Sequence, residues 1–276
     1  MDHVQERYLM SERQACKLVD LPRSVKRYRK RPDQNNELRQ ALIAMAQSFP
    51  RVGYRQLYDR LSRQGWVVNH KRIERLYAET GLALRRKRRT SKVVYERVPI
   101  AVPVCPNDGW AMDFVHDSLF NGRAIRCLTM IDIKSRFVPV IEVAFSLPGE
   151  RVVSVLNRLK EQRGLPRTIT VDNGPEFRSR TLQKWAKDND VRLDYIEPGQ
   201  PTQNAFIESF NATFRQECLD AHWFTSIADA KEKIEYWRND YNTERPHRSI
   251  GKLTPAEEEI KYFDKTKTES LTCEWT

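Results

Sequence analysis

The chain has 276 residues, more than one typical domain, and carries a formal charge of +11. Its five cysteines form no CxxC pair and its five histidines are scattered, which excludes zinc-finger spacing and argues against a disulfide framework. Reduced thiols in a cytosol are therefore expected. The sequence shows neither the apolar segment of a signal peptide nor an apolar run approaching the roughly 18 residues of a membrane span.

The basic charge is concentrated in the first third of the chain. Residues 1–100 contain 24 Lys and Arg against 10 Asp and Glu, a net of +14, whereas residues 101–276 contain 24 against 27, a net of −3. Such asymmetry is typical of a DNA-binding module joined to another domain. A solvated basic surface is the alternative, and basic proteins also bind membranes and acidic proteins.

The first hundred residues are predicted to be helical. Ser11 is a suitable N-cap for a helix that ends near Val19, and Ser24 for another that ends in a basic run before Pro32. Apolar residues at helical spacing predict a further helix over Asn36–Phe49.

Residues 50–82 have the pattern of a helix-turn-helix unit. A short helix is predicted over Tyr54–Arg63, Gly65 makes a turn, and Asn69 caps a second helix over His70–Glu79. The second helix would be the recognition helix, because its basic residues can reach phosphates and base edges. An ordinary helical hairpin with a solvated face is the alternative. The residues of this unit predicted to bind DNA are Arg55, His70, Lys71, Arg72 and Arg75.

Five consecutive basic residues follow the helix-turn-helix unit. Because like charges in a run do not pack into a core, they predict a linker that lies along a phosphate backbone and adds salt-dependent affinity. A targeting signal is the competing interpretation. The residues of the run are Arg85, Arg86, Lys87, Arg88 and Arg89.

After about residue 100 the pattern changes to apolar strands. Strands are predicted over residues 109–115, 124–133 and 137–145, with short connections that fit an antiparallel meander. Helices and strands then alternate over residues 150–163, 168–171, 179–189, 191–196 and 204–219. The order β-β-β-α-β-α-β-α matches a ribonuclease H-like core, although periodicity alone supports only an α/β or α+β fold.

Three acidic residues occupy unusual positions in this region. Asp113 lies inside an apolar strand, where an unpaired carboxylate is costly; Asp172 ends a strand before a Gly-Pro loop; Glu208 lies one turn into a helix. Each alone has an ordinary structural explanation, such as turn chemistry for Asp172. Together they would converge at one edge of a sheet. Hard oxygen ligands suit Mg²⁺ or Mn²⁺, and two such ions can promote an in-line phosphoryl displacement.

The spacing and the flanking residues of these carboxylates carry a resemblance. There are 35 residues between Asp172 and Glu208, and Arg215 lies seven positions after the Glu. The chain thereby resembles the DDE transposase and integrase superfamily, and more narrowly the OrfB proteins of the IS3 family of bacterial insertion sequences. The similar strings are Trp110-x-x-Asp113-Phe114, Val171-Asp172-Asn173-Gly174-Pro175-Glu176-Phe177, Asn204-x-x-x-Glu208-Ser209-Phe210-Asn211 and Tyr241-Asn242-Thr243-Glu244-Arg245-Pro246-His247.

The resemblance implies a multidomain α+β and α/β chain that acts as a DNA transposase. Asp113, Asp172 and Glu208 would hold two Mg²⁺ or Mn²⁺ ions for DNA strand cleavage and strand transfer at insertion-sequence ends, and Arg215 would approach DNA. The expected domains are an N-terminal helical and basic segment (1–35), a helix-turn-helix DNA-binding domain (36–84), a basic linker (85–100), a ribonuclease H-like mixed-sheet core (101–222) and a C-terminal helical extension and tail (223–276).

The implied partners are double-stranded DNA at element ends and target, further copies of the chain on DNA, and the OrfA product or an OrfA–OrfB fusion. The implied location is the bacterial cytoplasm, at the nucleoid, with no membrane partner. The segment that OrfA normally supplies, and the zinc module of retroviral relatives, are expected to be absent.

Two other functions stay open at this point: a DNA-binding regulatory partner of a longer OrfA–OrfB transposase, inactive alone, and a ribonuclease H-like hydrolase of RNA–DNA hybrids. Near the C-terminus, Trp237, Tyr241, Arg245 and His247 would contact DNA or a neighbouring subunit. Helix packing explains Trp237 and Tyr241 equally well.

Overall fold

A computed structural model describes residues 2–29, 33–84, 103–197 and 204–272. The chain divides into two compact units, residues 1–41 and 42–276. The first unit contains α1 (Asp2–Tyr8), α2 (Glu12–Leu18) and α3 (Arg23–Lys26).

Ser11 caps α2 through its side chain, as predicted, in a reciprocal capping box with Gln14. The helix predicted from Ser24 into the basic run is wrong in its bounds. It begins directly after Pro22 and has four residues. None of the four helical residues is buried, so no packing supports a longer helix.

The helix-turn-helix region has the predicted helices. They are α4 (Asn36–Ser48), α5 (Tyr54–Arg63) and α6 (His70–Glu79). Gly65 makes the turn with φ at 92°, a conformation that glycine adopts without strain, and the Asn69 side chain accepts a hydrogen bond from the Lys71 N–H at 2.9 Å. Leu57, Leu61, Ile73, Leu76 and Tyr77 form the buried apolar faces of α5 and α6.

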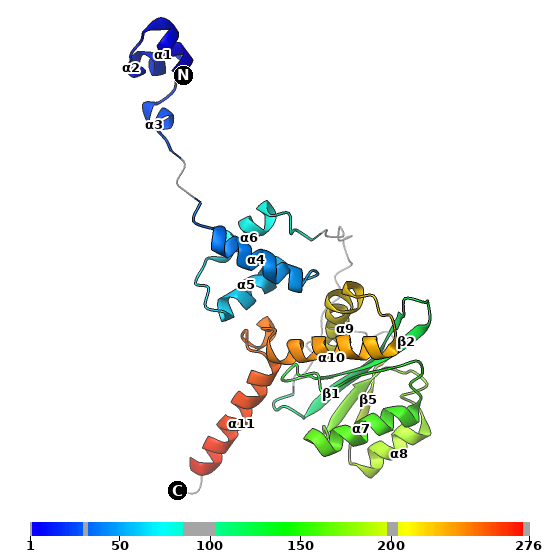
Figure 1. The fold of residues 1–276 in the computed structure, drawn as a ribbon. Helices are drawn as coiled ribbons and strands as arrows, with labels where there is room; N and C mark the ends of the chain where they lie inside the picture. Colours follow the sequence, from blue (N-terminus) through cyan, green and yellow to red (C-terminus); the bar gives the residue numbers. More distant parts are fainter. Residues whose placement is uncertain (1, 30–32, 85–102, 198–203, 273–276) are drawn as a thin grey trace. The chain divides into compact units, whose positions relative to one another are not determined.

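One mixed sheet of five strands forms the centre of the second unit (Figure 1). Its strands are β1 (Gly109–Ser118), β2 (Ala124–Asp132), β3 (Ile141–Ala144), β4 (Thr168–Val171) and β5 (Arg192–Tyr195). The order is β3-β2-β1-β4-β5; β1, β2 and β3 are antiparallel neighbours, and β4 runs parallel to both β1 and β5. This topology confirms the predicted ribonuclease H-like sheet.

The third strand is shorter than the predicted 137–145. Asn242 donates to the Val138 carbonyl and accepts from its N–H, both at 2.9 Å, and Arg238 donates to the same carbonyl. The backbone at Val138 therefore bonds to helix side chains instead of to β2. A strand pattern in the sequence does not reveal such competition for backbone groups.

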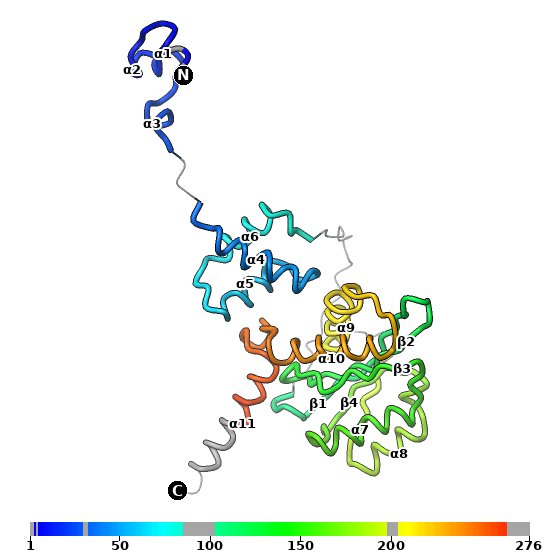
Figure 2. The backbone as a smooth tube through the Cα atoms, viewed as in Figure 1, coloured from blue at the N-terminus to red at the C-terminus, as the bar shows by residue number. Residues whose placement is uncertain are grey.

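Helices cover both faces of the sheet, with α7 (Gly149–Arg163) and α8 (Arg180–Asp188) together on one face and α9 (Ala205–Glu217) and α10 (Ile227–Thr243) on the other (Figure 2). Alternate residues of β1 divide between the two layers. Trp110 and Met112 pack with α7 and α8, whereas Ala111 and Val115 pack with α9 and α10. The same alternation places Asp113 on the α9 side.

The C-terminal part is helical, as predicted. After α9 come the 3-10 turn η2 (Leu219–Ala221), α10, the 3-10 turn η3 (Arg248–Ile250) and α11 (Pro255–Thr272). Phe210, Phe214, Trp237 and Tyr241 form one aromatic cluster between α9 and α10, with ring centroids 5.2–6.1 Å apart. Within the described residues, no helix has the length and apolar character needed to cross a membrane.

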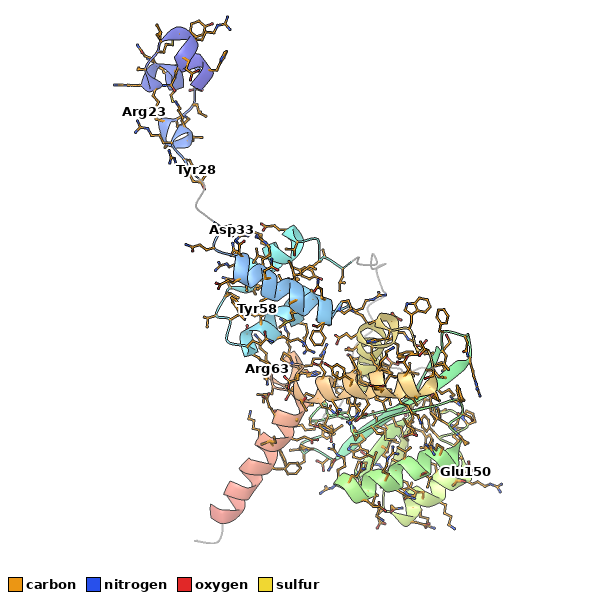
Figure 3. The ribbon with its side chains drawn as sticks, viewed as in Figure 1. Arg23, Tyr28, Asp33, Tyr58, Arg63 and Glu150 are labelled. Carbon is orange, nitrogen blue, oxygen red and sulfur yellow. The ribbon has the colours of Figure 1, made fainter. Side chains whose placement is uncertain are left out.

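Ion pairs join α5 to the C-terminal helices within this unit. Arg60 forms a two-pronged pair with Asp240 on α10, at 2.9 and 2.5 Å, and both side chains are largely buried. Arg63, labelled in Figure 3, pairs with Glu257 on α11 at 2.5 Å. These arginines are therefore engaged with carboxylates of the same chain.

Candidate active site

Asp113 is held by hydrogen bonds from two directions. One carboxylate oxygen accepts the N–H of Phe114 at 2.7 Å, and the other accepts the side-chain amide of Asn211 on α9 at 2.8 Å. Thr129, the partner of Asp113 across β1 and β2, donates to both the Asp113 carbonyl and the Asn211 side-chain oxygen. The shared contacts fix α9 against the strand that carries Asp113.

Asp172 follows the last residue of β4, next to β1 in the sheet. Ala111 is level with Thr170 in the parallel register, so Asp113, two residues further along β1, is expected level with Asp172, just beyond the end of β4. The Asp172 carboxylate accepts the N–H of Gly174 at 2.8 Å. A Cβ atom on Gly174 would lie 2.9 Å from that carboxylate oxygen, so only glycine fits beside Asp172 without displacing it.

Glu208 lies in the first turn of α9, three positions before Asn211, and its side chain is exposed. Burial raises the pKa of Asp113 above its ordinary value, and the negative charges of Asp172 and Glu208 act in the same direction. The negative charges of Asp172, just after β4, and of Glu208, on α9, therefore act on the Asp113 carboxyl of β1.

Carboxylate and amide oxygens are the ligands that Mg²⁺ and Mn²⁺ prefer, and a bound cation would offset the repulsion that raises the pKa of Asp113. The donor chemistry thus fits a divalent metal. In the side-chain arrangement of the described residues, however, no group of three or more Asp, Glu, His or Cys is compact enough to enclose an ion. Both oxygens of Asp113 already accept hydrogen bonds.

The loop after Asp172 packs against β1 through an aromatic stack. Phe177 stacks on Phe114 with ring centroids 4.8 Å apart, and Arg126 lies over Phe114 while pairing with Glu176 at 2.5 Å. Asn211 shares a sequence string and a helix face with Glu208, but its hydrogen bond to Asp113 was not predicted, nor were the positions of Thr129 and Arg126. The helical phase of Asn211 relative to Glu208 is a local signal in the sequence, whereas Thr129 and Arg126 have none.

Arg215, predicted to approach DNA, donates to the backbone carbonyl of His116 and lies within 4 Å of two aspartates, Asp117 and Asp220. Its side chain is 41% exposed, so it is partly available to a partner. Its role stays a prediction.

The residues predicted to bind DNA on the helix-turn-helix unit are mostly at the surface. Arg55, His70, Lys71 and Arg75 are exposed, and Arg72 is half-buried. Arg75 lies 3.6 Å from Glu79, and the His70 ring meets the Tyr58 ring edge-on. The basic run Arg85, Arg86, Lys87, Arg88 and Arg89 lies outside the described residues.

The four residues near the C-terminus that were predicted to contact DNA or another subunit are packed inside the second unit. They are Trp237, Tyr241, Arg245 and His247. Trp237 and Tyr241 belong to the aromatic core, and Arg245 pairs with Glu217 at 2.8 Å. Burial, followed by the charge of Arg245, lowers the pKa of His247 to about 3. Helix packing, the alternative interpretation, therefore explains Trp237 and Tyr241.

Comparison with known proteins agrees with this architecture. Residues 103–201 and 189–255 match families described as "Integrase core domain", and residues 33–90 match an "HTH-like domain". The chain is 46% identical over 263 residues to an uncharacterized 31.7 kDa protein of insertion element IS407 from Burkholderia multivorans, covering 95% of each chain. The chain belongs to the IS3 family of insertion-sequence transposases.

Other members and a solved structure extend the comparison. This chain is 24% identical to the putative transposase InsK for insertion sequence element IS150 of Escherichia coli, over 87% of this chain and 90% of InsK. A chain of the simian T-cell lymphotropic virus intasome, solved with PP2A regulatory subunit B56 gamma, has a TM-score of 0.53 and 17% identity, covering 78% of this chain and 73% of that chain. The structural similarity to this intasome chain confirms the fold.

Proposed function

We propose that this transposase-family chain cleaves DNA at insertion-sequence ends and joins the ends to target DNA, with two Mg²⁺ or Mn²⁺ ions held by Asp113, Asp172 and Glu208. The supporting observation is that the negative charges of Asp172 and Glu208 both act on the buried carboxyl of Asp113. The pKa of Asp113 is raised by its burial and by the charges of the other two. A site that gathers negative charge in this way favours a divalent cation.

The proposed reaction has two phosphoryl transfers. Water attacks a phosphodiester at the element end, its oxygen bonds to phosphorus, the bond to the 3′ oxygen breaks, and the 3′ oxygen gains a proton. The freed 3′-hydroxyl then attacks a target phosphodiester: its oxygen bonds to phosphorus and loses its proton to solvent, the bond to the target's 3′ oxygen breaks, and that oxygen gains a proton from solvent. Two divalent ions supply positive charge to the attacking and leaving oxygens in such a displacement. The protein needs no covalent nucleophile.

The chain's own residues position the carboxylates. The Phe114 N–H and the Asn211 amide orient Asp113, and the Gly174 N–H orients Asp172. Glu208 is carried on α9, which the aromatic core fixes against the sheet. Such preorganisation contributes because misplaced groups lose much of their effect on rate. Asn211 is accordingly a positioning residue for Asp113.

DNA would be held mainly by the N-terminal part of the chain. We assign DNA binding to residues 36–84, to the linker residues 85–100 and to Arg215. Within residues 36–84 the proposed contacts are Arg55, His70, Lys71, Arg72 and Arg75. Residues 101–222 are assigned to catalysis and residues 223–276 to a C-terminal extension. Joining two element ends calls for more than one copy on DNA, and an OrfA partner would complete end recognition. The proposed location is the bacterial nucleoid.

A single substitution tests the function. Glu208→Gln removes a negative ligand with little change in shape, so it should abolish strand transfer of an element-end oligonucleotide in Mg²⁺ while DNA binding persists. Glu161→Gln, on an exposed position of α7, is the matched control. The assignment fails if the Glu208 variant still joins ends. If the wild-type chain binds DNA but never nicks it, the chain is a regulatory partner that is inactive alone, and the proposed enzymatic function is wrong.

A further inference from the structure

The turn between β2 and β3 holds an arginine in an unfavourable conformation. Asp132 accepts the N–H groups of Lys134 and Ser135 at 2.9 and 2.8 Å, and the Arg136 N–H donates to the Asp132 carbonyl at 3.0 Å. Arg136 has φ at 64°, in the left-handed region where Gly and Asn are preferred. A strained residue that its surroundings fix so firmly is often retained for function.

The side chain of Arg136 forms no direct ion pair with an acidic residue among the described residues, although the Asp132 carboxylate acts on its charge. Its guanidinium lies 4.0 Å from the centre of the Phe206 ring, and the structure records no hydrogen bond or ion pair for it in the part of the chain described. Neighbouring arginines differ, because Arg245 is paired with Glu217 and Arg248 with Asp59. Arg136 therefore has no direct contact with a carboxylate in the described residues, and Asp132 acts on its charge only from a distance.

This guanidinium lines a pocket of about 500 Å³. The pocket also has hydroxyl groups and an aromatic wall; its lining includes Phe206, Ser209, Thr213, Arg245 and Ser249. Ser209 directly follows Glu208 on α9, and Thr213 lies one turn further along the same helix. The pocket therefore adjoins the helix that carries a proposed catalytic carboxylate.

We propose that this pocket binds a phosphate group of the DNA backbone, with Arg136 as the principal contact and the hydroxyls of Ser209, Thr213 and Ser249 as further donors. The proposal rests on the proposed function, since it supplies a site for DNA on the helix that also carries Glu208. Arginine matches the geometry of phosphate oxygens, and hydroxyl groups commonly complete phosphate contacts. Such a contact would set the register of the DNA relative to Glu208.

The backbone conformation supplies a clean test variant. Arg136→Asn removes the charge but places at φ 64° a residue that adopts this region readily, so the turn should keep its shape. Arg136→Lys keeps the charge and loses the planar fork. Arg167→Asn is the matched control, because it removes one positive charge from an 85% exposed side chain outside the pocket lining.

The measurement is the affinity for a DNA duplex of arbitrary sequence in EDTA, over a series of salt concentrations. Each phosphate contact contributes about 0.9 to the slope of log affinity against log salt. Arg136→Asn should therefore lower the slope by about 0.9 with an unchanged Tm, whereas Arg136→Lys and the Arg167 control should keep the wild-type slope.

The alternative outcomes separate the two proposals. A wild-type slope in Arg136→Asn would overturn the phosphate contact and leave the proposed function standing. Wild-type protein that binds no duplex would overturn both. If pyrophosphate raises the Tm of the wild type but not of Arg136→Asn, while DNA binding is the same in both, the pocket binds a free phosphate compound and the assignment to DNA is overturned.

Discussion

Gly174→Ala probes the site without touching a carboxylate. The added Cβ would lie 2.9 Å from the nearer Asp172 oxygen, against an ordinary contact of at least 3.4 Å. The carboxylate must therefore retreat by about 0.5 Å, and its hydrogen bond from the Gly174 N–H must lengthen from 2.8 Å. The backbone of Gly174 does not lie in the left-handed region, so alanine adds no conformational strain there.

The expected effect on rate follows from this displacement. A misplacement of about 1 Å can cost on the order of 10²-fold in rate, so a shift of half that size should slow strand transfer about ten-fold. DNA affinity and Tm should stay near the wild-type values, because the loop lies at the surface and one weakened hydrogen bond costs about 1 kcal/mol. Time courses of end joining in saturating DNA and Mg²⁺ measure the rate.

Gly53→Ala is the control for this variant. Gly53 has φ at −80°, and nothing lies within 4 Å of a Cβ built on it, so alanine should fit freely. Wild-type joining by Gly174→Ala, together with complete loss of joining by Asp172→Asn, would refute the reasoning. It would mean that the position of the Asp172 carboxylate is not set by the loop.

Three further predictions concern stability. Because burial and neighbouring negative charge raise the pKa of Asp113, its ionised form destabilises the metal-free fold. In EDTA the Tm of Asp113→Asn should therefore rise relative to that of the wild type as the pH increases from about 4 to 7, and a Tm difference that is the same at both pH values would contradict this. His247, with a folded pKa of about 3, stabilises the fold only while neutral, so stability should be lost as pH falls from about 6.5 toward 3, and His247→Asn should flatten that loss in urea titrations. Glu217→Ala leaves the buried Arg245 unpaired and should cost about 3–5 kcal/mol in urea unfolding; a loss under about 1 kcal/mol would show that water compensates the arginine.

The order and kind of most elements could be predicted from the sequence. The helices of residues 54–63 and 70–79 and the strand of residues 168–171 have the predicted bounds, because caps, glycines and apolar period are local signals. Local signals failed after Ser24 and before Ile141. The four helical residues after Pro22 have no buried contacts to support a longer helix, and before Ile141 hydrogen bonds from distant helix side chains replace strand pairing.

The candidate site divides in the same way. The sequence by itself determined the three carboxylates and their spacing, since residue identity and number along the chain are all that spacing requires. Only the tertiary structure decided that Asn211, 98 residues from Asp113, orients it, and that Arg136 meets a pocket beside α9. Sheet register and helix packing bring such groups together, and neither can be read from the local hydrophobic periodicity of the sequence.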